Sequence, residues 1–172
     1  YKAKRGRGER YLKDEQALEA YLLDLALSNA SITAAAATAP LEELPLRDLL
    51  QAASSYSKVL DRFVMRMIDE RVVDASIRAG IPLEADFADG DRLRGPVVEA
   101  IEAEFAKVDP DSELPEWSLE PHSSAGQRLV ARSRRNGTNY SAVFDPEFLR
   151  SNDYARLIRL NEDITAIGRP PY

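Results

Sequence analysis

A run of apolar residues at helical spacing dominates the middle of the chain and most restricts how it can fold. Its members recur every three or four positions: Leu46, Leu49, Leu50, Ala53, Tyr56, Leu60, Phe63, Val64, Met67 and Ile68. This spacing places them on one face of a helix. A long helix with one apolar face needs other elements to cover that face. The pattern therefore predicts an amphipathic helix over residues 46–68 that organises a core.

Shorter segments on both sides also show helical periodicity and helix-end signals. Asp14 occupies the position of an N-cap, and Gly80 occupies the position of a C-cap. Either Asp89 or Asp91 can cap a further helix, in which Pro96 falls in the first turns. The predicted helices cover about residues 15–28, 70–79, 89–108 and 152–167. Residues 31–36 fit either a short strand or a loop.

Other segments have the pattern of strands. Residues 117–120, 127–134 and 138–144 read as three short strands. Asn136-Gly137 between the last two is typical of a type I′ hairpin turn. The first twelve residues fit a second hairpin that turns around Gly6 and Gly8. Helices followed by an antiparallel meander predict an α+β fold: several amphipathic helices, a short meander and an N-terminal β-hairpin.

The length of 172 residues suits one ordinary domain. We expect a single domain over residues 1–172 with four parts: an N-terminal hairpin and tether (1–13), a mainly helical part (14–116), antiparallel strands (117–144), and a C-terminal helix and tether (145–172). The first residue is Tyr1, which suggests a piece of a longer chain. No apolar run reaches the length of a membrane span. We expect a cytoplasmic protein with no membrane partner.

The side chains available for catalysis are few. The chain has no Cys and a single His, which excludes a disulfide scaffold, a thiol nucleophile and a Cys-ligated or multi-His metal site. His122 lies near no serine in a nucleophile motif, so we expect a surface or turn histidine. Trp117 is expected in the core rather than on a ligand platform.

Charge is segregated along a chain whose formal net charge is −6. Residues 1–13 hold six Lys or Arg against one Glu, and residues 117–144 hold four Arg against one Glu. Residues 81–116 hold eleven acids against three bases. The candidate contacts for DNA or a protein partner are the basic side chains Lys2, Lys4, Arg5, Arg7, Arg10, Arg128, Arg132, Arg134 and Arg135. A solvated strand face is the simpler interpretation of both basic segments.

Two acidic clusters raise the question of a metal site. One contains Asp86, Asp89 and Asp91, and the other contains Asp109, Asp111 and Glu113. Neither has the spacing of an EF-hand loop, and helix capping explains such residues without an ion. A carboxylate-dependent hydrolase that uses Mg²⁺ or Ca²⁺ is the least favoured hypothesis.

Both ends of the chain resemble a known family. Residues 1–6 (YKAKRG) and 9–15 (ERYLKDE) are similar to the start of the insert in the TOPRIM domain of the DNA gyrase B subunit, as found in many Gram-negative bacteria. Residues 145–149 (DPEFL) and 153–156 (DYAR) resemble the segment in which that insert ends. Residues 38–116 match in pattern more than in identity.

The resemblance implies membership of an ATP-dependent type II topoisomerase that introduces negative supercoils and uses ATP and Mg²⁺. The motifs that hold those functions in the family are absent here: Glu-Gly-Asp-Ser, Asp-x-Asp-x-Asp-Gly and Gln-Arg-Tyr-Lys-Gly-Leu-Gly. The resemblance therefore transfers no catalytic, cofactor-binding or metal-binding residue to this chain. We expect no cofactor in this fragment and no enzymatic activity from it alone.

The expected role is that of a non-catalytic accessory insert, a buttress that couples DNA binding to ATP turnover. Its implied partners are other domains of the gyrase B subunit, the gyrase A subunit, and duplex DNA. An insertion must leave its host fold intact, so Tyr1 and Tyr172 are expected to lie close together. The alternative is a direct DNA-binding module that uses the basic β-hairpins.

Overall fold

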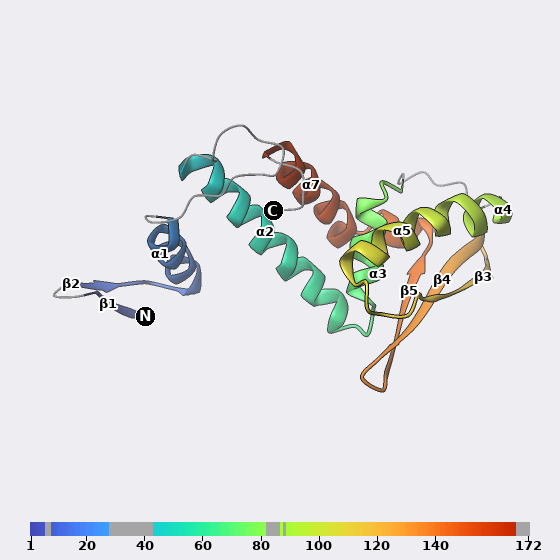
Figure 1. Cartoon of the computed structure of the whole chain (residues 1–172), viewed down its shortest axis with the longest axis horizontal. Coiled ribbons are helices and arrows are strands. Elements are labelled where there is room, and N and C mark those ends of the chain that lie inside the picture. Colours follow the sequence, from blue (N-terminus) through green and yellow to red (C-terminus); the bar gives the residue numbers. More distant parts are fainter. Residues whose placement is uncertain (6–7, 28–42, 82–86, 88, 168–172) are drawn as a thin grey trace. The chain divides into compact units, whose positions relative to one another are not determined.

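The computed structural model describes residues 1–5, 8–27, 43–81, 87 and 89–167 of the chain (Figure 1). The elements are, in order, β1 (Lys2–Arg5), β2 (Gly8–Tyr11), α1 (Glu15–Leu27), α2 (Glu43–Val64), α3 (Glu70–Arg78), α4 (Gly90–Arg92), the π-helical η1 (Leu93–Val97), α5 (Val98–Val108), β3 (Glu116–His122), β4 (Gly126–Arg135), β5 (Thr138–Phe144), α6 (Pro146–Leu149) and α7 (Asn152–Ile167). Helices and two small antiparallel sheets confirm the predicted α+β class. No helix among these residues is long and apolar enough to cross a membrane.

The chain forms two compact units, and each is described by itself. Unit 1 comprises residues 1–54 and 163–172, and unit 2 comprises residues 55–162. The boundary falls within α2 and within α7. The residues expected as a strand or loop at 31–36, together with Arg7 and Tyr172, lie outside the described part, so the expected proximity of the chain ends is not tested.

Unit 1 contains the predicted N-terminal hairpin and the helix that follows it. β1 and β2 pair antiparallel, with Lys2 opposite Tyr11. The Asp14 carboxylate accepts a hydrogen bond from the Ala17 N–H at 2.8 Å, which confirms the predicted N-cap of α1. A small core of buried and half-buried aliphatic side chains joins α1, α2 and the end of α7: Leu23, Leu27, Leu46, Leu49, Leu50, Ile164 and Ile167.

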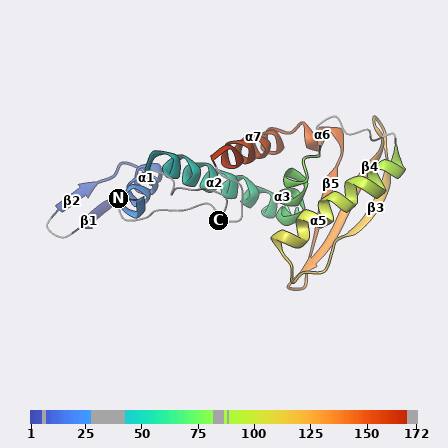
Figure 2. The same ribbon diagram turned by 45° about the horizontal axis from the view of Figure 1, so that its top comes forward.

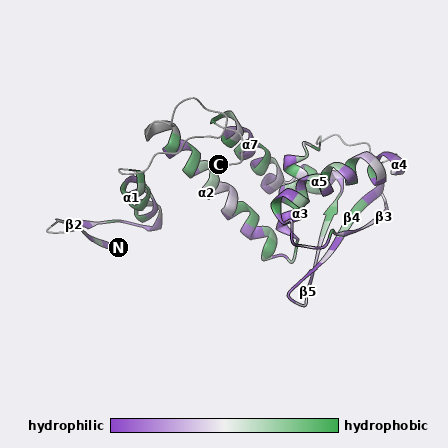
Figure 3. Ribbon diagram, in the orientation of Figure 1, coloured by the Kyte–Doolittle hydropathy of each residue, from purple (hydrophilic) through white to green (hydrophobic). Residues whose placement is uncertain are grey.

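Unit 2 is built on the predicted meander, in the order β3-β4-β5. Asn136 and Gly137 have φ angles of 50° and 81°, as a type I′ turn requires at both positions, so the predicted turn is confirmed. Figure 3 shows a hydrophilic turn and a hydrophobic end of β5. The antiparallel register sets Trp117 opposite Ala131 and Ala131 opposite Ala142. These residues share one face of the sheet, and the half-buried Trp117 packs against the buried Phe144.

Helices α3 and α5 pack together and cover this face of the sheet (Figures 1 and 2). Seven consecutive residues of α3, from Arg71 to Ile77, are buried. Helix α5 contributes the buried residues Val98, Ile101 and Phe105. Pro96, which lacks a backbone N–H, lies in the wider turn of η1 just before α5, in the first turns of the predicted helix.

An aromatic cluster joins strand β5 to three helices in unit 2. The Phe148 ring lies 5.8 Å from the Phe63 ring, 5.5 Å from the Phe144 ring and 5.3 Å from the Tyr154 ring, measured between centroids. These side chains come from α2, β5, α6 and α7. Phe63, Phe144 and Tyr154 are fully buried, so the cluster is a central part of the core.

Helix α2 ends at Val64, four residues before the end of the predicted helix. The Ile68 N–H donates to the Phe63 carbonyl at 3.0 Å and the Met67 N–H donates to the Val64 carbonyl at 2.9 Å. This is a Schellman motif, with Met67 at the left-handed position and a φ of 59°. The predicted helix was four residues too long because Met67 and Ile68 continue the apolar pattern. No glycine lies just after Val64 to indicate the end of the helix.

We predict that Met67→Gly stabilises the protein by about 0.5–1 kcal/mol. Glycine adopts a positive φ without the steric cost that a Cβ adds. The matched control is Met65→Gly, because Met65 still makes a helical hydrogen bond to the Asp61 carbonyl and is 86% exposed. That change should destabilise by a similar amount. Urea unfolding measures both, and a lower midpoint for Met67→Gly would contradict the prediction.

Candidate interaction surface

Three of the predicted arginines share one face of β4. Arg128, Arg132 and Arg134 alternate along the strand, and Glu120 of β3 lies opposite Arg128. The Arg128 Nε and Nη2 atoms donate to Glu120 Oε2 at 3.0 and 2.6 Å. The Arg132 Nη2 atom donates to Glu120 Oε1 at 2.5 Å. One carboxylate therefore binds two of the guanidinium groups expected to contact DNA or a partner.

These contacts also set the electrostatics of Glu120. Hydrogen bonds from Arg128 and then Arg132 lower the pKa of Glu120 below its ordinary value of 4.5. The carboxylate is thus held in its charged form, which is the form that binds both arginines. Arg132 also donates from Nη1 to Ser118 Oγ at 2.7 Å, so its head group is held from two sides.

Arg134 differs from its neighbours on β4. It is exposed, and it forms no ion pair within the part of the chain that the structure describes. It lies opposite Asn139 and lines an open pocket of about 510 Å³ that also includes Glu113 and Glu116. Of the arginines on this strand face, Arg134 has the charge most available to a partner.

Arg135 lies on the opposite face of the sheet, away from the other β4 arginines. Its Nη1 atom donates to Glu70 Oε1 at 2.7 Å, and its guanidinium lies 5.0 Å from the centre of the Tyr140 ring. The hydrogen bond to Glu70 is the main cause of a raised pKa for Arg135. The contact with Glu70 ties the turn end of β4 to the first turn of α3.

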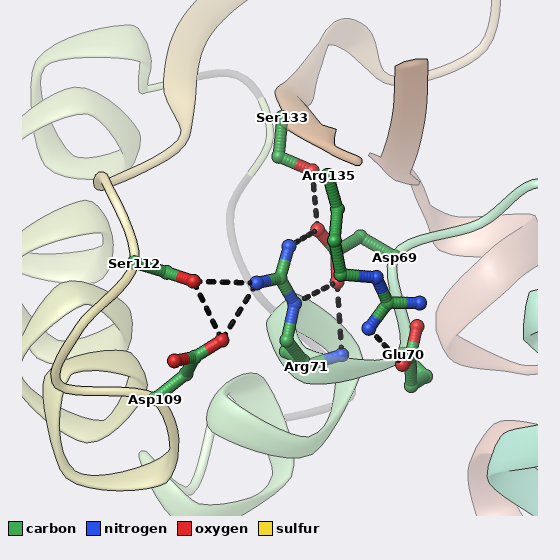
Figure 4. Close-up of polar contacts among 7 residues, drawn as sticks. All are labelled: Asp69, Glu70, Arg71, Asp109, Ser112, Ser133 and Arg135. Atoms are coloured by element: carbon green, nitrogen blue, oxygen red, sulfur yellow. Dashed lines mark hydrogen bonds and ion pairs between the residues drawn. The ribbon is translucent and has the colours of Figure 1, made fainter. Parts of the chain in front are cut away.

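A buried polar network surrounds Arg71, beside the Arg135–Glu70 pair (Figure 4). Arg71 binds Asp69 through two parallel hydrogen bonds, Nε to Oδ1 at 3.0 Å and Nη2 to Oδ2 at 2.7 Å. Its Nη1 atom donates to Asp109 Oδ2 at 2.7 Å and to Ser112 Oγ at 2.9 Å. Ser133 of β4 donates to Asp69 Oδ2. The network therefore joins α3, the segment after α5 and β4.

Asp69 is the most buried charge in this network. It is 1% exposed and also caps α3 by accepting a hydrogen bond from the Arg71 N–H at 3.1 Å. Burial alone raises the pKa of Asp69, but hydrogen bonds from Arg71 and Ser133 outweigh it and bring the pKa below its ordinary value of 3.8. The hydrogen bond to Asp69, followed by the one to Asp109, raises the pKa of Arg71. Asp69 and Arg71 are therefore both charged at neutral pH, and each side chain stabilises the charged form of the other.

Comparison with known families gives the context of this fold. The model for the DNA gyrase B subunit insert domain matches residues 30–168, which is most of the chain. The chain belongs to this family. A second family model, described as the hook of GyrB, matches residues 1–27. The resemblance stated from the chain ends is thereby confirmed, and the insert is part of a type II topoisomerase, in the context of other gyrase B domains.

The two matches meet between residues 27 and 30, where α1 ends. The hook segment carries the other basic candidates. Lys2 pairs with Glu9 at 2.8 Å and lies over the Tyr11 ring, and Arg10 lies over the Tyr21 ring. Lys4 is exposed and forms no ion pair with the described residues, whereas Arg7 falls outside them. Arg5 belongs to β1.

The acidic clusters of the insert have structural contacts. Asp89 caps α4 by accepting from the Arg92 N–H at 3.0 Å, and Asp109 binds Arg71 and Ser112. Asp86 lies outside the described residues. The cap made by Asp89 agrees with the expectation that helix capping explains such residues, whereas the Asp109 carboxylate binds Arg71 and Ser112 instead of a helix N-terminus.

Sequence reasoning missed Glu120 and Arg71 as important residues. The alternation of β3 was available in the sequence and would have placed Glu120 on the same face as Arg128. Arg71 had no comparable signal, because its two carboxylate partners are 2 and 38 positions away and approach only after folding.

Proposed function

We propose that this chain acts as a non-catalytic accessory domain of the gyrase B subunit that buttresses neighbouring domains and couples DNA binding to ATP turnover. The family match over residues 30–168 is the observation that carries the proposal. In this proposal the complete enzyme works in the cytoplasm on duplex DNA together with the gyrase A subunit, and it supplies the sites for ATP and Mg²⁺. The chain alone has no enzymatic activity.

The internal contacts of unit 2 support a mechanical role. A buttress must transmit force without local unfolding, so its elements need to be joined by contacts that fail together. The Arg71 network joins α3, β4 and the segment after α5, and the aromatic cluster joins α2, β5, α6 and α7. Within unit 2, most of the described elements are therefore coupled through two buried clusters.

Direct DNA binding through the basic hairpins is the alternative function. Phosphate binding needs cations whose charge is not already neutralised. Arg128 and Arg132 share Glu120, and Arg135 binds Glu70. Arg134 of β4 and Lys4 of β1 are exposed and form no ion pair with the described residues, so they favour this alternative, but so few free cations give a weak electrostatic attraction to a duplex.

Replacement of the insert in the complete enzyme tests the proposal. Residues 30–168 would be exchanged for a flexible Gly/Ser linker in the full-length gyrase B subunit, which is then assembled with the gyrase A subunit. We expect DNA affinity and DNA-stimulated ATPase activity to fall at least about fivefold, the low end of typical coupling between sites. Supercoiling should be lost, whereas ATPase activity without DNA should persist. Unchanged supercoiling, DNA affinity and ATPase activity would refute the proposal.

A further inference from the structure

The single histidine meets two carboxylates where β3 ends and α6 begins. His122 is the last residue of β3 and not a turn residue, and its side chain is only 16% exposed. Its Nε2 atom lies 4.0 Å from Asp145 Oδ2 and 3.5 Å from Glu147 Oε2. The three ligand atoms all lie within 4.8 Å of one another. Three potential metal donors of mixed type, one nitrogen and two oxygens, thus surround one point.

The other atoms of these side chains are already engaged. Asp145 Oδ1 accepts the Phe148 N–H at 2.7 Å, and Glu147 Oε1 accepts a hydrogen bond from Ser124 Oγ at 3.3 Å. The remaining oxygens, Oδ2 and Oε2, face the imidazole. Among the described residues, no Lys or Arg forms an ion pair with either carboxylate. Two anionic groups held this close repel each other unless a cation lies between them.

Ser124 also positions the imidazole. Its Oγ atom lies 3.4 Å from His122 Nδ1. With Nδ1 protonated and directed at Ser124, the lone pair of Nε2 points toward the two carboxylates. Histidines that bind metals usually have such a partner on the second ring nitrogen. Glu147 is 65% exposed, so an ion and its waters can reach the cluster from solvent.

We propose that His122, Asp145 and Glu147 form a binding site for a divalent transition-metal ion, with Zn²⁺ as the best match. An imidazole nitrogen favours zinc over magnesium or calcium, which prefer oxygen ligands alone. Ligands of a tetrahedral zinc ion lie about 3.4 Å apart at bond lengths of about 2.1 Å. The 3.5 Å between Nε2 and Glu147 Oε2 already fits this value, and a small rotation of the His122 ring or the Asp145 carboxylate closes the 4.0 Å between Nε2 and Asp145 Oδ2. Water would complete the coordination.

The bound ion would link the end of β3 to the start of α6. His122 and Glu147 are 25 positions apart, and the whole β4–β5 hairpin lies between them. The ion therefore stabilises the meander against the helices that follow it. This role is independent of the coupling function proposed above, because it concerns the stability of unit 2 alone.

Zn²⁺ titration of the full, tag-free chain after treatment with EDTA tests the site. We expect the thermal midpoint to rise with Zn²⁺ concentration, and equal concentrations of Mg²⁺ or Ca²⁺ to have no such effect. Calorimetry should show one site, whose affinity falls about 100-fold or more in His122→Ala and about 10-fold in Ser124→Ala. Glu113→Gln, an exposed acid outside the cluster, is the matched control and should bind like wild type.

A second measurement covers the case in which a variant folds poorly. Because the chain has one histidine, its imidazole nitrogens give one set of ¹⁵N signals. Stoichiometric Zn²⁺ should shift the Nε2 signal of the wild-type chain. An unchanged imidazole spectrum, or equal Zn²⁺ affinity in wild type and His122→Ala, would mean an adventitious ion only and would overturn the proposal.

Discussion

Arg71→Met should destabilise the protein by about 3–5 kcal/mol. Methionine retains most of the apolar stem of Arg71, but it removes the guanidinium that lies over the Phe105 ring and every side-chain donor that Arg71 gives to Asp69 and Asp109. Asp69 would remain as a buried charge without its cationic partner. Removing one partner of a buried ion pair typically lowers the free energy of unfolding by about 3–5 kcal/mol. Urea unfolding monitored by circular dichroism at neutral pH measures the difference.

The matched control removes an exposed ion pair. Arg62 binds Asp153 at 3.0 Å on the surface of unit 2, and the arginine side chain is 52% exposed. Arg62→Met should cost less than about 1 kcal/mol, because solvent screens the pair and Arg66 also contacts Asp153. Equal losses in the two variants would show that the Arg71 network contributes no more than a surface contact.

The effect of Arg71→Met should also depend on pH. In the wild type the depressed pKa of Asp69 gives stability that is present above the ordinary carboxyl pKa and is lost as pH falls through the folded-state value. In the variant, burial without Arg71 raises the pKa of Asp69, so acidification neutralises the uncompensated charge. The difference in the free energy of unfolding between wild type and Arg71→Met should therefore become smaller as the pH is lowered from about 7 to about 4. A constant difference would locate the loss in packing instead of charge.

Phe63→Ala should have a similarly large effect, about 3–5 kcal/mol, through loss of packing. Phe63 is 1% exposed and contacts the Phe148 ring at the centre of the aromatic cluster. Truncation to alanine removes buried apolar area and leaves a cavity that neighbours fill only in part. The expected loss is independent of pH, in contrast to that of Arg71→Met.

Met65→Ala is the control for Phe63→Ala. It lies two positions away, in the turn that follows α2, and is 86% exposed. The free energy of unfolding of Met65→Ala should stay within about 0.5 kcal/mol of the wild-type value. Thermal unfolding compares the three proteins, and an equal shift for both variants would place Phe63 outside the core.

The elements that the sequence predicted well are those with local signals. The Asn136-Gly137 turn, the Asp14 cap and the alternating strands each depend on residues within a few positions of one another. The end of α2 was predicted four residues too late, because Met67 adopts a left-handed conformation that glycine usually occupies. The hydrogen bonds that stop the helix involve backbone atoms, which leave no trace in the side-chain pattern.

The candidate surface was predicted in part. The alternation of Arg128, Arg132 and Arg134 on one face follows from strand geometry alone. Their pairing with Glu120 depends on the register of β3, and the separation of Arg135 onto the other face follows from the same two-residue period. The His122 cluster could not be predicted, because Asp145 and Glu147 reach it only when the chain returns from β5 into α6.

The most direct test of the coupling role uses the complete enzyme with two single variants. Arg71→Met weakens the internal structure of unit 2, whereas Arg134→Glu reverses the exposed charge that direct DNA binding would use. DNA-stimulated ATPase activity should be measured at a temperature at which the wild-type insert is folded and the Arg71→Met insert is unfolded. This temperature lies between the thermal unfolding midpoints of the two proteins. The account predicts that Arg71→Met loses the stimulation and that Arg134→Glu keeps it. Loss of stimulation in Arg134→Glu with full stimulation in Arg71→Met would contradict the account and favour direct DNA binding.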